Sequence, residues 1–165
     1  MNGPHRSLRR VLACLAGLAG LAVYAATADA SQARPASVLR TITFATPWTG
    51  GHQTQIDLGT KGLGPGDIFL ITGRPMLSQG NQIGTLEGVE AILSSAHDGI
   101  VSQQATLRLA GGRVMVEGVG RQDDKPFRLA VVGGTGNYIH ASGQLTALGE
   151  DAKNKLYLFK LVLRR

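Results

Sequence analysis

One acidic residue, Glu90, interrupts an apolar segment near the middle of the chain. It lies between Val89 and Ala91, and in an extended strand it would share a face with Ile92. Carboxylates in apolar cavities have raised pKa values and can act as general acids or bases. A glutamate on the outer face of a sheet, or one paired with an arginine such as Arg74, would show the same pattern. The sequence leaves these three placements open.

A glycine-rich segment, LAVVGGTGNYIHASGQL at residues 129–145, is the second candidate site. Glycines after an apolar strand are typical of nucleotide-binding turns, which also need a third glycine and a following helix. Here Ile139 stands at the third glycine position, and no helical apolar stripe follows. The segment therefore favours a strand-to-strand turn in which Gly133, Gly134 and Gly136 include positions with positive φ.

Other polar residues give weaker signals. His52, His97 and His140 have no metal-ligand spacing, so no metal site is expected. Asp67 follows Gly64-Pro65-Gly66 and is expected to anchor that turn. The formal net charge is +6, but the basic residues are dispersed and the aromatic ones are few. This composition gives no support for nucleic-acid binding.

The N-terminus has the order of a secretory signal peptide. Arg6, Arg9 and Arg10 precede an apolar run at residues 11–26, and the small-residue site Ala28-Asp29-Ala30 follows. An uncleaved membrane anchor is the alternative, because the run is nearly long enough to span a bilayer. The sole cysteine, Cys14, belongs to this segment, so a processed chain would have no disulfide and would depend on its core.

We expect cleavage before Ser31, giving a secreted protein without stable membrane insertion. Intact-mass measurement of protein from the culture medium tests this prediction. Protein that keeps Met1 and sediments with membranes would contradict it.

The rest of the chain has the pattern of an all-β domain. Short apolar runs alternate with glycine-rich turns, and no helical stripe persists. Residues 1–30 are interpreted as the signal, 31–37 as a flexible lead, and 38–165 as one domain. The expected strands cover residues 39–46, 52–57, 67–77, 83–95, 100–109, 113–119, 127–132 and 144–163, the last with a break near GEDAKNK. Eight strands indicate a sandwich or a closed barrel, and closure would leave no edge strands.

Both faces of two strands are apolar. Phe69 and Ile71 are expected on one face of strand 67–77, with Ile68, Leu70 and Met76 on the other. The strand at residues 156–163 likewise carries apolar residues at both odd and even positions. A monomeric barrel has polar outer positions. The pattern therefore predicts an outer surface that another subunit covers.

Four segments carry a resemblance to a known family: KGLGPGDIFLITGRPM, NQIGTLEGVEAIL, ATLRLAGGRVMVEG and PFRLAVVGGTGNYIHASGQL. In this order and spacing, over residues 56–162, they resemble the allene oxide cyclase and dirigent superfamily, in particular its secreted bacterial members. The resemblance implies an eight-stranded antiparallel β-barrel with an apolar cavity, usually assembled as a homotrimer. It also implies that the glycines at 133–136 turn the chain between barrel strands, with Thr135 and Tyr138 fixing the turn.

The resemblance further implies chemistry without a cofactor, in which the barrel excludes water and fixes the geometry of its substrate. Glu90 stands where the cyclases have a cavity cysteine, Gly73 where they have an asparagine, and Gly120 near their tyrosine position. His140 and Ser142 stand where small and basic residues are common in the family. Glu90 is thus the candidate catalytic residue. The candidate cavity residues are Phe69, Ile71, Gly73, Ile92, Tyr157 and Phe159.

Two functions follow as hypotheses. The first is a secreted barrel that binds a small apolar molecule and guides its cyclisation or stereoselective coupling. The second is a non-catalytic module that carries a ligand or acts through its surface. A polar group in an open cavity would favour the first, and an interior filled by Phe69, Ile71 and Phe159 would favour the second.

Overall fold

The computed structural model describes residues 38–94 and 99–164. The expected signal peptide, the lead at 31–37 and His97 lie outside these residues. The described chain is all-β, and it contains no helix long and apolar enough to cross a membrane. Its strands are β1 (Val38–Pro47), β2 (His52–Ile56), β3 (Ile68–Ser78), β4 (Asn81–Ile92), β5 (Ile100–Leu109), β6 (Gly112–Arg121), β7 (Phe127–Gly136), β8 (Ser142–Asp151) and β9 (Leu156–Arg164).

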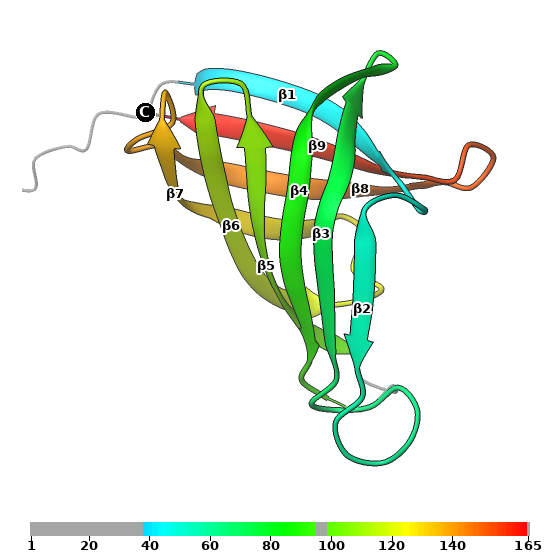
Figure 1. Ribbon diagram of the computed structural model, residues 1–165. Coiled ribbons are helices and arrows are strands. Elements are labelled where there is room, and N and C mark those ends of the chain that lie inside the picture. Colours follow the sequence, from blue (N-terminus) through cyan, green and yellow to red (C-terminus); the bar gives the residue numbers. More distant parts are fainter. Residues whose placement is uncertain (1–37, 95–98, 165) are drawn as a thin grey trace, which may run out of the picture. The chain divides into compact units, whose positions relative to one another are not determined.

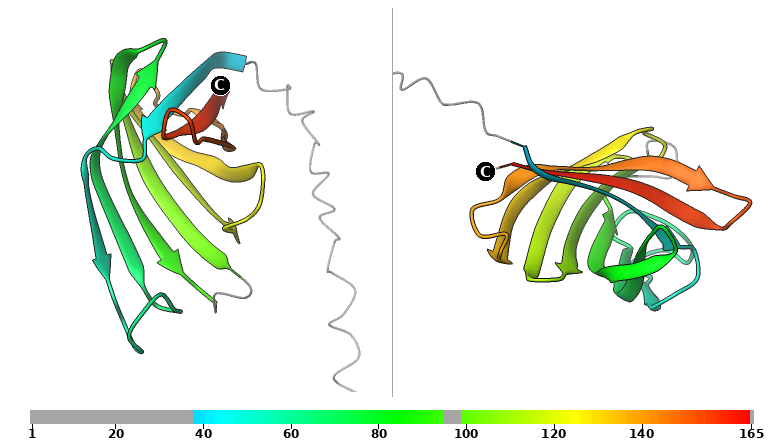
Figure 2. Two further views of the ribbon diagram at one scale, coloured as in Figure 1. Left: turned by 90° about the vertical axis from the view of Figure 1, so that its right-hand side faces the viewer. Right: turned by 90° about the horizontal axis from the view of Figure 1, so that it is seen from above.

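The strands form a closed antiparallel barrel (Figures 1 and 2). Their order is β1-β9-β8-β7-β6-β5-β4-β3-β2, and β1 also pairs with β3 at Ala45 and Leu77. This pairing closes the barrel, while β2 continues along the remaining part of β3 from His52 to Ile56. Because β1 and β2 share one edge of β3, eight strand positions surround the interior. The prediction of an eight-stranded antiparallel barrel is confirmed.

The last expected strand is a hairpin of two strands. β8 and β9 meet at residues 152–155, inside the GEDAKNK segment where the break was expected. The Asp151 carboxylate accepts hydrogen bonds from the backbone nitrogen of Asn154 at 3.1 Å and from its Nδ2 at 2.7 Å. These bonds lower the pKa of Asp151, because they stabilise its charged form.

A β-bulge in β3 changes which residues face the interior. The pairing of β3 with β4 shifts between Ile71 and Arg74, and Gly73 has φ +64°. An extra residue reverses the side-chain alternation beyond the bulge. Met76 is therefore fully buried in the core, and the expectation that it lies opposite Phe69 and Ile71 is wrong.

Fully buried aliphatic side chains fill one end of the barrel. Leu107, Val114, Leu161 and Leu163 are all 0 % exposed and belong to one core cluster. Beyond this cluster, Phe69, Ile71 and Phe159 are only partly buried where they pack against it. The packed end thus supports the walls of a less completely filled end.

The glycine-rich turn joins β7 to β8 and packs on the β5–β6 hairpin. Gly136 has φ +61°, and a Cβ there would lie 2.2 Å from the Gly111 oxygen. Thr135 Oγ1 accepts the Arg113 backbone N–H at 3.2 Å, and the Tyr138 hydroxyl donates to the Ala110 oxygen at 3.2 Å.

Neither Gly133 nor Gly134 has a positive φ, but a Cβ on Gly134 would lie 2.3 Å from the Tyr138 oxygen. The glycines therefore allow close backbone contact between two turns.

The β5–β6 hairpin turns at Ala110 and Gly111, because Leu109 pairs with Gly112. Gly111 has φ +88°, which glycine adopts at little cost.

We expect Gly136→Val to lower the free energy of unfolding by more than about 1 kcal/mol, because both its φ and its contacts exclude a side chain. Gly64→Val is the control, since Gly64 lacks a positive φ and has open space around its Cβ position. Urea unfolding of the two variants provides the comparison. Equal stability of both, or a nucleotide-dependent rise in Tm of the wild type, would contradict the turn interpretation.

Candidate functional site: a cavity inside the barrel

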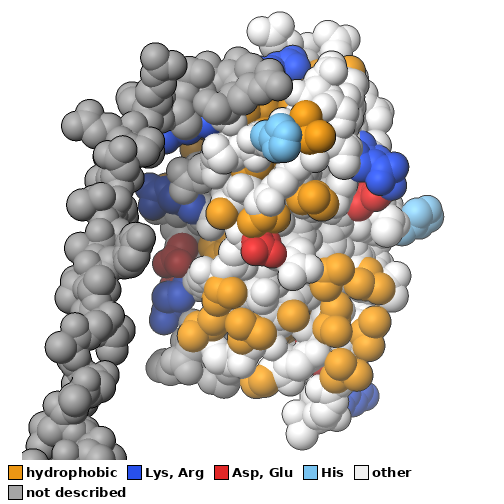
Figure 3. Space-filling model, turned by 90° about the vertical axis from the view of Figure 1, so that its left-hand side faces the viewer, with side chains coloured by type: hydrophobic (Ala, Val, Ile, Leu, Met, Phe, Trp, Pro, Cys, Tyr) orange, Lys and Arg blue, Asp and Glu red, His pale blue; other side chains and the backbone are white. Residues whose placement is uncertain are grey.

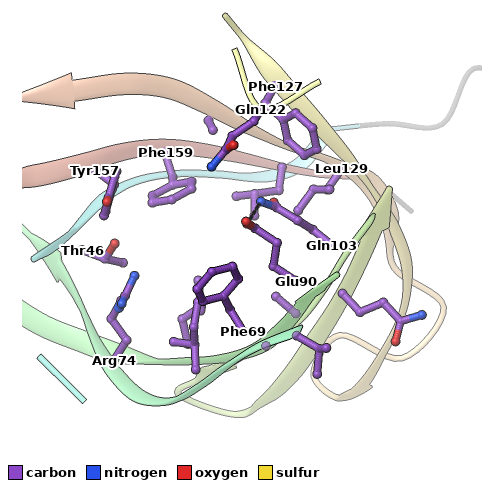
Figure 4. Close-up of a pocket in the computed structure, with 18 of the residues that line it drawn as sticks. Thr46, Phe69, Arg74, Glu90, Gln103, Gln122, Phe127, Leu129, Tyr157 and Phe159 are labelled. Carbon is purple, nitrogen blue, oxygen red and sulfur yellow. Dashed lines mark hydrogen bonds between the residues drawn. The ribbon is translucent and has the colours of Figure 1, made fainter. Parts of the chain in front are cut away.

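The less filled end of the barrel encloses a cavity of about 380 Å³ (Figure 4). Its walls come from β1 to β5 and β7 to β9, and its remaining lining residues come from the connections after β2 and β6. This volume is in the range of pockets that hold a small organic molecule.

Aromatic and aliphatic side chains form most of the wall. Four of the candidate cavity residues, Phe69, Ile71, Tyr157 and Phe159, line the cavity. Phe159 stacks on Phe44 of the core, with ring centroids 5.2 Å apart and planes inclined by 16°. Phe44 and Phe159 are also partners in the register of β1 and β9, so the two rings hold each other in place and an apolar ligand would meet a preformed surface.

Two other candidate cavity residues lie elsewhere. Ile92 is 6 % exposed and belongs to the core cluster, not to the lining of the cavity. Gly73 is exposed at the bulge of β3 and does not line the cavity either. The bulge explains the placement of Gly73, because it turns the next residue, Arg74, inward instead.

Glu90 points into the cavity, as Figure 4 shows. It lies opposite Gln103 in the register of β4 and β5, and Gln103 Nε2 donates a hydrogen bond to Glu90 Oε2. Glu90 forms no ion pair with Arg74 in the part of the chain that the structure describes. The sequence left open a cavity, an outer face or an arginine pair for Glu90, and the structure places this residue in the cavity. The Gln103 amide holds the carboxylate in a defined orientation against an apolar wall.

Arg74 is a second charged group in the same cavity. It is 8 % exposed, and its Nη2 donates to Gln53 Oε1 at 2.8 Å. Its Nε is buried and has no hydrogen-bond partner. Figure 4 shows its guanidinium near Thr46 and Tyr157, on the other side of Phe69 from Glu90.

The sequence did not identify Gln103, Gln53, Thr46 or an inward Arg74 as site residues. A signal for Arg74 was present, because a glycine inside a strand followed by proline two residues later indicates a bulge. Gln103 had no such signal. Its position follows only from the pairing register of β4 and β5.

The connection between β2 and β3 places Leu63 in the lining of the cavity. Asp67 holds this connection, as expected: its Oδ1 accepts the Leu58 N–H at 2.8 Å, and its Oδ2 accepts the Gly64 N–H at 2.9 Å. Asp67 is 0 % exposed and does not line the cavity. Its role in the structure is therefore to fix the loop.

The described residues contain no cluster of three or more histidine, cysteine or acidic side chains arranged to hold a metal ion. Among the described residues, the other charged side chains of the lining are Asp124, Lys125 and Glu150, and all three are exposed. The cavity thus offers one held carboxylate, one buried guanidinium and several amides within apolar walls.

The chain is similar in structure to several solved proteins. A pyocyanin demethylase has 22 % sequence identity, with 75 % of this chain and 99 % of that chain covered and a TM-score of 0.65. A pterocarpan synthase dirigent protein has 13 % identity, 78 % and 96 % coverage, and a TM-score of 0.58. A Diels–Alderase from Streptomyces koyangensis has 17 % identity, 76 % and 64 % coverage, and a TM-score of 0.58.

No protein-family model matches the chain, and no curated protein sequence matches it. At these identities the structural similarities establish the fold. The resemblance in sequence implied a closed antiparallel barrel with an interior cavity, and the structure has both features. The chain therefore has an allene oxide cyclase/dirigent-like barrel fold.

Proposed function

We propose that this protein is a secreted barrel that binds a small apolar molecule in its cavity and guides a cyclisation or stereoselective coupling without a cofactor. The observation that carries the proposal is the Glu90–Gln103 pair on the wall of a cavity lined mostly by aromatic and aliphatic side chains. The neighbouring structures support it, because they include a dirigent protein and a Diels–Alderase. Secretion rests on the sequence of residues 1–30.

The aromatic residues of the cavity and the Glu90 carboxylate have different roles in this proposal. Phe69, Tyr157 and Phe159 exclude water and limit the conformations of a bound molecule, which favours one reacting geometry. Glu90 accepts a proton from the substrate or stabilises positive charge that develops beside it. The Gln103 amide orients the carboxylate for that role.

Binding of a neutral aromatic probe, 2-naphthamide, tests the cavity. We expect Ala147→Trp to weaken this binding at least about tenfold, because Ala147 lines the cavity and an indole would fill part of it. Ala110→Trp is the matched control at an exposed turn outside the lining. Isothermal titration calorimetry measures both affinities. Unchanged binding by Ala147→Trp would show that the probe lies outside the barrel.

We also propose self-association as a homotrimer. Large apolar side chains on the outer face of the single chain are exposed to solvent. The exposed fractions are 40 % for Val89, 41 % for Met115, 62 % for Val119 and 50 % for Val132. Figure 3 shows hydrophobic side chains gathered on one outer face of the described barrel. Burying such area contributes roughly 25 cal/mol per Å².

Light scattering of the mature protein checks this proposal, and we expect the mass of three chains. Replacing Val119 and Val132 with Ser should shift the mass toward that of one chain, because both side chains are largely exposed. A wild-type mass of one chain, even in concentrated solution, would contradict self-association.

A further inference from the structure

Arg74 is a buried charge whose hydrogen bonds are incomplete. Its side chain is inside the barrel, one nitrogen donates to Gln53, and Nε has no partner. Within the described residues it has no carboxylate partner. Arginine keeps its charge inside proteins, so burial without a counter-ion costs free energy. Such a group in an open cavity is poised for an anionic partner from outside the chain.

We infer that the molecule bound in this cavity carries a carboxylate that pairs with Arg74. The inference rests on the proposed ligand-binding function and narrows the class of ligand to apolar acids. A guanidinium fits a carboxylate by charge and by its fork of N–H donors. A phosphate, with more charge, would need further cations, and among the described lining residues the only other basic side chain is that of the exposed Lys125.

The positions of the two charged groups define how such a ligand lies. Arg74 and Glu90 lie on either side of Phe69, and both point into the cavity (Figure 4). With its carboxylate at Arg74, the ligand places its apolar body against Phe69 and Phe159. Its far part then reaches Glu90, whose negative charge would repel a carboxylate bound in the opposite direction. The pair of charges therefore selects one orientation.

A matched pair of probes tests this inference: 2-naphthoate and the uncharged 2-naphthamide, titrated by calorimetry. We expect the wild type to bind 2-naphthoate at least about tenfold more tightly, which is the order of a charge-assisted hydrogen bond. In Arg74→Met the two affinities should become equal within about twofold, with 2-naphthamide binding unchanged. Arg128→Met removes the same charge from an exposed position of β7 and should keep the wild-type preference.

Each result decides the question. Equal binding of both probes by the wild type, or a preference that survives in Arg74→Met, overturns the pairing with Arg74 and leaves the proposed binding function in place. Absence of binding of both probes overturns the binding function as well. If Arg74→Met does not fold, Arg74→Gln allows the same comparison, because it also removes the charge and keeps a polar group near the position of the Arg74 Nε. An Arg74→Met protein that folds with an unchanged or higher Tm supports a ligand-binding role, since a structural arginine would lower it.

Discussion

Replacing Glu90 with Gln is expected to abolish turnover while leaving the barrel folded and able to bind its ligand. The substitution keeps the size of the side chain and its contact with Gln103, but removes the charge and the basic oxygen. General acid–base groups contribute about 10²–10⁴-fold to rates. We therefore expect at least a ~100-fold loss in the conversion of any compound that the wild type consumes. Mass spectrometry of metabolite extracts incubated with each protein provides the measurement.

Glu87→Gln is the matched control on the same strand. Glu87 pairs with Arg108 at 2.7 Å and does not line the internal cavity, so its variant should convert the same compounds at the wild-type rate. Glu90→Leu separates packing from charge: it should also lose turnover, but with little loss of stability, because it removes a charged group from an apolar wall. Wild-type turnover by Glu90→Gln would exclude a catalytic role for Glu90 and favour the non-catalytic carrier.

The second large effect is on stability, at Asp67. Asp67→Ala removes the acceptor of two backbone N–H groups, those of Leu58 and Gly64. Each hydrogen bond to a charged group contributes about 1.5–3 kcal/mol, and water replaces part of both bonds in this partly exposed loop, so we expect a loss of about 2–4 kcal/mol in the free energy of unfolding. The same loop carries Leu63 to the cavity, and its loosening should also weaken binding of 2-naphthamide.

Asp57 gives a control within the same loop. Its Oδ2 accepts the Gly62 N–H at 3.2 Å, but the group is exposed, and water can replace it. Asp57→Ala should therefore change stability by less than about 0.5 kcal/mol. Urea unfolding measures the free energy of unfolding of the two variants. Equal losses in both would show that the Asp67 hydrogen bonds stabilise the loop no more than the exposed Asp57 bond does.

Much of the fold could be predicted from the sequence because its signals are local. Alternating apolar residues mark the strands, and the glycine-rich segments mark turns that admit no side chain, as at Gly136 and Gly111. The break in the final strand was also visible, since GEDAKNK has the turn residues that Asp151 and Asn154 use. These features depend on residues that are near each other in the chain.

The site residues were harder to predict from the sequence, because their positions depend on the pairing register of the strands. Alternation of side chains places Glu90 inside, but its partner Gln103 belongs to another strand and is set by the β4–β5 pairing. One bulge at Gly73 reverses the alternation in β3, which brings Arg74 and Met76 inside and leaves Gly73 out. Ile92 shares the parity of Glu90, yet it is buried at the end of β4 opposite Val101 of β5, because parity gives the face of the sheet and not the position of the cavity along the barrel.

A crystal structure of the protein with bound 2-naphthoate would show directly whether the barrel interior binds a ligand. We expect the naphthalene ring inside the barrel against Phe69 and Phe159, with its carboxylate on Arg74 and its far edge toward Glu90. A probe bound on the outer face beside Met115 and Val132, or an interior closed by side chains with no space for it, would contradict the central claim that this barrel is a ligand cavity.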